Sequence, residues 1–168
     1  SQKLLKAKRE GKLPKVLVPV HLTGNPCQMF EIFKLSKIYN FKIIEDASHA
    51  IGAKYKDKYI GNCEYSDITI FSFHPVKIIT TGEGGLATTN DPELARKMRL
   101  FRTHGITKEE KYFENTSPGP WFYEQQNLGF NYRMNDIQAA LGISQLKRLD
   151  CFVERRNLLL DQYKELLS

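Results

Sequence analysis

The chain has 168 residues, of which 41% are hydrophobic and 26% are charged, a composition typical of a soluble globular domain. Its formal net charge is +6, but residues 1–15 hold six basic side chains and one acidic side chain, so +5 of that charge lies there and +1 is left for the other 153 residues. This uneven distribution argues against a nucleic-acid-binding surface. The basic segment predicts a solvated helix end, with a phosphate-binding arm as the alternative.

Three cysteines, Cys27, Cys63 and Cys151, lie far apart and form no CxxC pair, so we expect reduced thiols and no metal site. No apolar run is long enough for a signal peptide or a membrane span. These features predict a cytoplasmic protein that binds neither membranes nor nucleic acids.

The first half of the chain alternates strands with a helix. The apolar, β-branched run Lys15–Val20 predicts a buried strand, and Phe41–Asp46 predicts a second strand. Between them, residues 27–40 carry apolar side chains at a helical spacing. Strand, helix and strand joined by short connections predict a parallel βαβ unit.

The next elements are shorter. Residues 52–61 predict an exposed hairpin, Asp67–Phe73 a third strand and Gly84–Asn90 a fourth strand. A helix is predicted to begin at Pro92, with Asp91 as its N-cap.

Residues 103–128 predict a long loop, because they are rich in polar, aromatic, glycine and proline residues. From Asn135 onward the pattern becomes helical. A parallel sheet needs cover on both faces, and this chain offers elements for only part of one, so we expect a fragment of a longer protein.

Four side chains that could take part in catalysis lie at or just after the ends of two predicted strands. Asp46 ends one strand, while Ser72 and His74 end the next, with Lys77 just beyond. Ligands of open α/β sheets bind at the carboxyl ends of the strands. A lysine amine in a partly dry pocket can attack a carbonyl, and a buried aspartate suits a protonated pyridine nitrogen.

Each of these residues also has a simpler interpretation. Asp46 could cap a local turn, His49 could be a satisfied core histidine and Lys77 could be an ordinary surface lysine. The run "TTGEGG" (residues 80–85) could be only a hairpin turn. None of these residues is specific alone, but the order Asp, then Ser-x-His-x-x-Lys, is harder to dismiss.

The runs "EDASHAIGAKY", "SFHPVKIITTGEGGLATTND", "RTHGI" and "LGFNYRMNDIQAALGISQL" resemble the DegT/DnrJ/EryC1/StrS sugar aminotransferases. The resemblance covers the chain from about Val16 to its end. It implies an α/β fold that forms part of the large domain of an aspartate aminotransferase-like (fold type I) pyridoxal phosphate enzyme. Residues 1–148 would belong to this cofactor-binding domain, and residues 149–168 would form a helix leading towards a C-terminal small domain.

The resemblance also implies roles for individual residues. Lys77 matches the lysine that forms the Schiff base with pyridoxal 5'-phosphate, and Asp46 matches the acid that pairs with the pyridine nitrogen. His49 matches a position beside the cofactor ring near its phenolic oxygen, and Ser72 matches the phosphate-binding serine. Asn131 matches an asparagine that reaches the cofactor phosphate of the neighbouring subunit, which implies a homodimer with shared active sites.

The resemblance implies amino transfer from glutamate to a nucleotide-linked keto-sugar. Among the members, those that aminate C4 of a UDP-4-keto-6-deoxy-N-acetylhexosamine on the way to pseudaminic acid are the most similar. His74, Trp121 and Tyr123 are candidates for contact with the sugar nucleotide. The chain lacks the family's N-terminal segment and small domain, so we expect the fragment alone to be inactive.

Three alternatives remain open. The protein could aminate another position of a keto-sugar. It could be a sugar 3-dehydrase, but those enzymes carry histidine in place of the Schiff-base lysine. It could also be a truncated, non-catalytic fold-type-I interaction module.

Overall fold

A computed structural model describes residues 1–167, which form two compact units. The first unit joins residues 1–90 with the residues from 136 onward, and the second unit consists of Asp91–Asn135. The candidate residues Asp46, His49, Ser72 and Lys77 belong to the first unit, whereas Asn131 belongs to the second.

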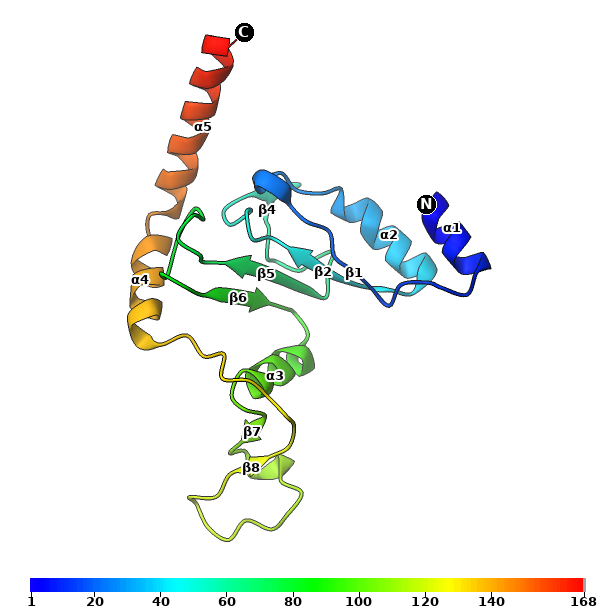
Figure 1. Cartoon of the computed structure of the whole chain (residues 1–168), viewed down its shortest axis with the longest axis vertical. Coiled ribbons are helices and arrows are strands. Elements are labelled where there is room, and N and C mark those ends of the chain that lie inside the picture. Colours follow the sequence, from blue (N-terminus) through cyan, green and yellow to red (C-terminus); the bar gives the residue numbers. More distant parts are fainter. Residues whose placement is uncertain (168) are drawn as a thin grey trace. The chain divides into compact units, whose positions relative to one another are not determined.

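A four-stranded sheet is the centre of the first unit, with the strands in the order β1-β2-β5-β6 (Figure 1). Strands β1, β2 and β5 are parallel to one another, and β6 runs antiparallel to β5. The fold is therefore α/β with a mostly parallel sheet, as the sequence predicts. The strands are β1 (Val16–Leu17), β2 (Lys42–Asp46), β5 (Ile68–Ser72) and β6 (Gly85–Thr88).

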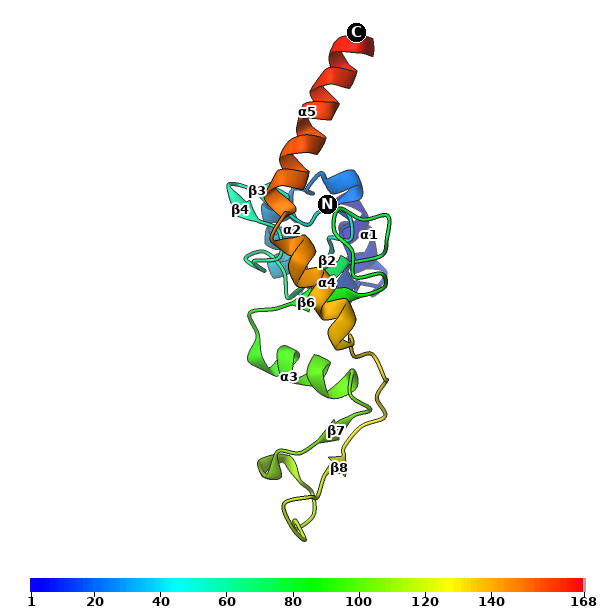
Figure 2. The ribbon, with the colours of Figure 1, turned by 90° about the vertical axis from the view of Figure 1, so that its left-hand side faces the viewer.

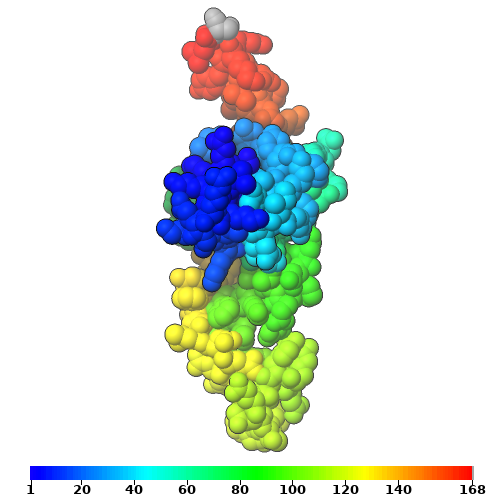
Figure 3. Space-filling model, turned by 90° about the vertical axis from the view of Figure 1, so that its right-hand side faces the viewer, coloured from blue at the N-terminus to red at the C-terminus, as the bar shows by residue number. Residues whose placement is uncertain are grey.

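Helices α1 (Gln2–Arg9) and α2 (Met29–Tyr39) lie side by side on the surface of this unit, as the dark-blue and light-blue segments of Figure 3 show. Beneath them, Met29, Phe41 and Ile43 form a buried core cluster, which Leu4 of α1 also contacts. Along β2 the residues alternate between this buried face and the other face, so Ile43 and Glu45 point inward.

The prediction of a buried strand at Lys15–Val20 is wrong in part. Strand β1 contains only Val16 and Leu17, with a further parallel bridge between Val20 and Asp46. Leu17 packs against the core cluster, but Val16, Val18 and Val20 are 45%, 53% and 48% exposed. Strand β1 lies at the edge of the sheet, and these alternate residues point away from the face that the core cluster occupies.

Three local predictions are confirmed. Strands β3 (Lys54–Tyr55) and β4 (Lys58–Tyr59) pair as an antiparallel hairpin. Helix α3 (Pro92–Phe101) begins at Pro92, and the Asp91 carboxylate accepts the N–H groups of Glu93 and Leu94 at 2.8 and 3.2 Å. The helical pattern from Asn135 onward corresponds to α4 (Asp136–Leu146) and α5 (Leu149–Leu167), which follow each other in Figure 2.

The second unit differs from the predicted long loop. Residues 103–128 include a short antiparallel pair, β7 (Ile106–Thr107) and β8 (Glu124–Gln125), and a 3-10 turn, η2 (Glu110–Tyr112). Strands of two residues are too short to show the alternation that identifies a strand in a sequence. Within residues 1–167, no helix has both the length and the apolar character that crossing a membrane requires.

Candidate active site

Asp46 and Ser72 lie at the same end of the sheet, where two parallel strands finish. Asp46 is the last residue of β2, Ser72 is the last residue of β5, and the two strands are parallel neighbours with Asp46 paired to Ile70. The carboxyl ends of parallel strands thus place a carboxylate and a hydroxyl near each other, as predicted.

Lys77 lies in the connection between β5 and β6, residues 73–84. Its backbone N–H donates to the carbonyl of His74 at 2.9 Å, which closes a tight turn. The loop is tied to its own start, because the Phe73 carbonyl accepts the Thr81 N–H at 3.1 Å and the Thr80 hydroxyl at 2.9 Å. The glycine-rich run therefore does serve as part of a hairpin connection. The same connection carries Lys77, which is half-buried.

Charges converge on Asp46. Hydrogen bonding from the Ser48 side chain is the main cause that holds the pKa of the Asp46 carboxyl below its usual value, and the Ser48 N–H, which donates to Asp46 Oδ1 at 3.0 Å, adds to it. The nearby Lys77 amine and His49 imidazole favour the ionised carboxylate and lower that pKa further. The interpretation of Asp46 as the cap of a local turn is thus correct. The same carboxylate also lies close enough to Lys77 and His49 for both side chains to lower its pKa.

An open groove of about 1010 Å³ adjoins this group within the first unit. His49 and Lys77 line it together with a second lysine, Lys54, and the first turns of α5. Asp46 and Ser72 are not among the residues that line the groove.

Three glycines allow the walls of this region to approach closely. A Cβ at Gly24 would lie 3.0 Å from the carbonyl oxygen of His49, and one at Gly52 would lie 2.9 Å from Val153 of α5. In α4, a Cβ at Gly142 would lie 2.8 Å from the Thr81 methyl group in the Lys77 loop. A larger residue at any of them would displace a segment next to Lys77 or His49.

The remaining predicted site residues are one in the Lys77 loop and three in the second unit. His74 is exposed, with its Nε2 3.7 Å from the Glu83 carboxylate. In the second unit, Asn131 is exposed and forms an antiparallel bridge with Thr103, and the side chains of Trp121 and Tyr123 are 71% and 56% exposed.

Comparisons with known proteins identify the family. The profile of the DegT/DnrJ/EryC1/StrS aminotransferase family matches residues 3–168. This chain belongs to that family. It is 47% identical over 137 residues to the UDP-4-amino-4,6-dideoxy-N-acetyl-beta-L-altrosamine transaminase of Campylobacter jejuni, covering 82% of this chain and 34% of the relative. The chain thus spans about a third of that relative's length.

Solved structures of family members have the same fold. The aminotransferase PseC of Helicobacter pylori, described as involved in the biosynthesis of pseudoaminic acid, superposes with a TM-score of 0.73 at 38% identity, over 83% of this chain and 34% of PseC. The sugar aminotransferase Spr1654 of Streptococcus pneumoniae in its PLP-form gives a TM-score of 0.74 at 31% identity, over 90% and 41% of the two chains.

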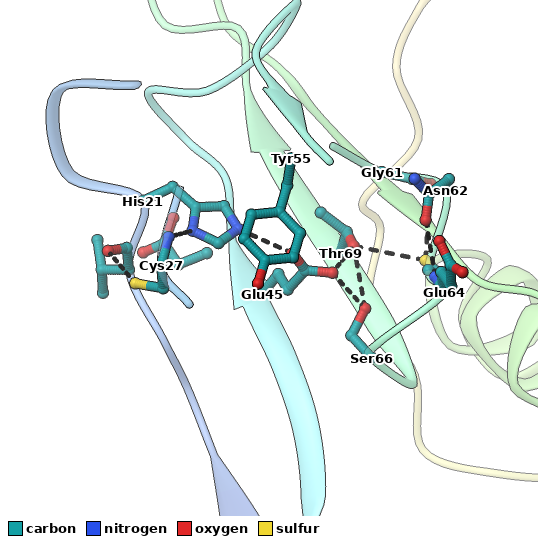
Figure 4. A network of polar contacts seen from close by, with 12 residues as sticks. His21, Cys27, Glu45, Tyr55, Gly61, Asn62, Glu64, Ser66 and Thr69 are labelled. Carbon is teal, nitrogen blue, oxygen red and sulfur yellow. Dashed lines mark hydrogen bonds and ion pairs between the residues drawn. The ribbon is translucent and has the colours of Figure 1, made fainter. Parts of the chain in front are cut away.

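Sequence reasoning missed a buried polar network behind the site, shown in Figure 4. At its centre, the Glu45 carboxylate accepts hydrogen bonds from His21, Ser66 and Thr69. The one available signal was the alternation of β2, which places Glu45 on the same inward face as Ile43. Partners that are 24 residues away on other elements leave no mark in the sequence near Glu45.

Proposed function

We propose that the complete protein is a pyridoxal 5'-phosphate-dependent aminotransferase that moves an amino group from glutamate to a nucleotide-linked keto-sugar. The observation that carries the proposal is the placement of Asp46 and Ser72 at the ends of two neighbouring parallel strands, with Lys77 in the connection that follows Ser72, in a chain of an aminotransferase family. A family member with the same fold is described in a PLP-form. The cofactor supplies an aldehyde that takes up amines and a pyridinium ring that accepts electrons.

The donor set of this chain fits that cofactor. Lys77 offers an amine for the aldehyde, and Ser72 offers a hydroxyl for the phosphate. The Asp46 carboxylate stays ionised, because the hydrogen bond from Ser48 and the nearby positive charges lower its pKa, and an ionised carboxylate keeps a pyridine nitrogen protonated. His49 would lie beside the ring, near its phenolic oxygen.

Lys77 has a second task in this proposal. With the cofactor and an amino donor bound, the free Nζ of Lys77 would remove the proton from the donor's Cα as a general base and would later return a proton as a general acid. In the second half of the cycle, the same Nζ delivers a proton at the sugar carbon that receives the amine. A cycle of two such halves gives ping-pong kinetics.

For the substrate, we propose C4 of a UDP-4-keto-6-deoxy-N-acetylhexosamine, in the synthesis of pseudaminic acid. The names of the Campylobacter relative and of the Helicobacter structure support this choice. The exposed rings of Trp121 and Tyr123, together with His74, are the candidates for contact with the sugar nucleotide. Proton NMR of the product tests the position, because amination at C3 would change different ring-proton couplings.

We further propose a homodimer in which Asn131 serves the cofactor of the partner subunit. Mixing an inactive Lys77→Ala protein with an inactive Asn131→Ala protein tests this, since a mixed dimer would contain one complete site. Random exchange of equal amounts should restore about a quarter of the wild-type activity, because half of the dimers are mixed and each has one working site. Demonstrated exchange with no recovery would place Asn131 in its own subunit's site or in a structural role.

Borohydride reduction of the complete, cofactor-loaded protein tests the central assignment. Peptide mapping should find the pyridoxyl label on Lys77. Lys54 is the matched control, because it lines the same groove. Lys54→Ala should keep the label, and Lys77→Ala should lose it. A label on Lys54, or no label in a protein that binds the cofactor, would refute the assignment.

A further inference from the structure

A buried anion lies next to Asp46 on the opposite face of β2. The side chain of Glu45 is only 5% exposed, and its Oε2 accepts a hydrogen bond from His21 Nε2 at 2.8 Å (Figure 4). Its Oε1 accepts the Thr69 hydroxyl at 3.0 Å and also the Ser66 hydroxyl. Burial opposes ionisation, but these hydrogen bonds outweigh it and hold the pKa of Glu45 below its usual value.

His21 is fixed at both of its ring nitrogens. Its side chain is fully buried, and its Nδ1 accepts the backbone N–H of Cys27 at 3.1 Å. A ring nitrogen that accepts an N–H carries no proton, so the proton of His21 lies on Nε2 and points at Glu45. The pair is therefore a neutral imidazole that donates to a carboxylate, and the ring has one orientation that satisfies both contacts.

The backbone around His21 holds Asp46 from both sides. The N–H of His21 donates to the Asp46 carbonyl at 3.0 Å, and the Asp46 N–H donates to the Pro19 carbonyl at 2.9 Å. Because Glu45 fixes His21, these two hydrogen bonds also fix the backbone of Asp46. Glu45 and Asp46 thus anchor the same segment, one through its side chain and one through its main chain.

The same segment also reaches His49. The N–H of Thr23 donates to His49 Nδ1 at 3.3 Å. Thr23 has a φ of +57°, a conformation that costs a β-branched residue free energy and persists only where its surroundings impose it. Gly24 follows at φ +85° and passes within contact distance of the His49 carbonyl. A strained turn thus aims one N–H at one imidazole nitrogen.

We propose that residues 19–24 are a positioning segment: anchored by His21 on Glu45, it fixes the backbone of Asp46 and the tautomer of His49. Because Nδ1 accepts from Thr23, the proton of the neutral His49 ring lies on Nε2. His49, which lines the groove, therefore meets an oxygen of the cofactor as a neutral hydrogen-bond donor. The cofactor part of this inference rests on the proposed function.

The first test reads the tautomer of His49 in the complete protein without cofactor. Long-range 1H–15N spectra of histidine-labelled protein, assigned by comparison with a His49→Gln variant, should show His49 with Nε2 protonated. Glu45→Gln replaces the carboxylate by a neutral amide with a single acceptor oxygen, which holds His21, Ser66 and Thr69 less firmly, so the segment should shift and His49 should populate both tautomers. Ile43→Val, on the same buried face of β2, is the control and should leave the His49 signals unchanged.

A second pair of variants covers the case in which Glu45→Gln fails to fold. Gly24→Ala and Gly11→Ala both force alanine into a left-handed conformation, at φ +85° and +66°. An added Cβ at Gly24 meets the His49 carbonyl, whereas one at Gly11 has nothing within 4 Å. Gly24→Ala should change the His49 signals, and Gly11→Ala should not.

Cofactor binding supplies the second readout. Loss of a residue that positions a binding group typically costs about tenfold or more in affinity, so Glu45→Gln and Gly24→Ala should weaken pyridoxal phosphate binding by about that factor relative to their controls. The inference is overturned if His49 carries its proton on Nδ1 in the wild type. It is also overturned if the His49 signals of Glu45→Gln and Gly24→Ala are the same as those of the control variants. Absence of cofactor binding by the wild type would refute the proposed function and leave the tautomer result to stand by itself.

Discussion

The neighbouring carboxylates Glu45 and Asp46 lie on opposite faces of β2 and differ in burial and in their hydrogen-bond donors. Glu45 faces inward, where three side-chain donors satisfy it and almost no surface remains. Asp46 faces outward, where its hydrogen-bond donors come from Ser48 and the His49 and Lys77 side chains lie within electrostatic range. Both carboxyl groups have lowered pKa values. A buried carboxylate held by three side-chain donors thus supports the structure, whereas a partly exposed carboxylate with donors from a single residue keeps acceptor sites for a ligand.

The two faces are also held together by different means. On the inward face, hydrogen bonds between side chains connect β2 to β5 and to the segment before α2. On the outward face, close approaches at Gly24, Gly52 and Gly142 bring backbone segments together around Lys77 and His49. A substitution should therefore act mainly on stability on one face and mainly on turnover on the other.

The largest expected effect is that of Asp46→Asn on turnover. An amide cannot keep a pyridine nitrogen protonated, so kcat should fall by about 10²–10³-fold, as for loss of one preorganised electrostatic group. Cofactor binding and the urea midpoint should change little. Asp57→Asn, the same chemical change in the exposed hairpin turn, is the control. Unchanged turnover in Asp46→Asn would show that Asp46 serves only as the cap of the Ser48 turn.

Next comes the stability loss of Glu45→Ala. It leaves the buried donors of His21 and Thr69 without an acceptor and opens a cavity, so the free energy of unfolding should fall by about 2–4 kcal/mol. The exposed pair of Glu64 with Lys58 gives the control, Glu64→Ala, which should cost at most about 1 kcal/mol. Equal losses in urea unfolding would mean that the inward network contributes no more than a surface ion pair.

A smaller effect concerns acid stability. A carboxyl group whose folded pKa is lowered stabilises the fold above its unfolded pKa, and this contribution is lost as the pH falls through the folded value. Glu45→Gln should therefore flatten the fall in unfolding free energy below about pH 4. Lys77→Ala should flatten it only slightly, because the Ser48 hydrogen bond is the main cause at Asp46. If the curves of unfolding free energy against pH for both variants superposed on that of the wild type, neither carboxylate would contribute to acid stability in the way described.

The smallest expected change is that of Gly142→Ala. Alanine in a helix interior is normally worth about 1 kcal/mol more than glycine. Here the added Cβ would lie 2.8 Å from a methyl group of Thr81, which is buried and whose hydroxyl bonds to the Glu83 carbonyl at 2.7 Å. We expect no gain in thermal stability and a measurable loss of turnover, because the Lys77 loop must move. Ser144→Ala, exposed on the same helix, should give the usual gain.

The sequence was sufficient for the features that repeat along one segment. Alternation and helical spacing predicted β2, β5, α2 and α3 to within one or two residues, and the strand ends then placed Asp46 and Ser72 at one edge. Lys77 followed from its distance to the end of β5. The family also follows from these local runs, because they resemble the motifs of its members and the family profile matches residues 3–168.

What the sequence could not predict depends on contacts between distant segments. Nothing near His21 shows that its ring is buried on Glu45, and nothing near Thr23 shows that its N–H faces His49. The valines of residues 16–20 look like a buried strand, but their exposure depends on the strand order, which places β1 at the edge. The roles of Asn131, Trp121 and Tyr123 stay predictions.

The antiparallel pairing of β6 with β5 has a consequence for the order of folding. A hairpin joins residues close in the chain, whereas the parallel pair of β1 with β2 encloses a whole helix and must close a longer loop. Contacts of short range form faster, so we expect the β5–β6 hairpin to assemble first. Lys77 would then be held in its turn before β2, the strand that carries Asp46, has joined the sheet.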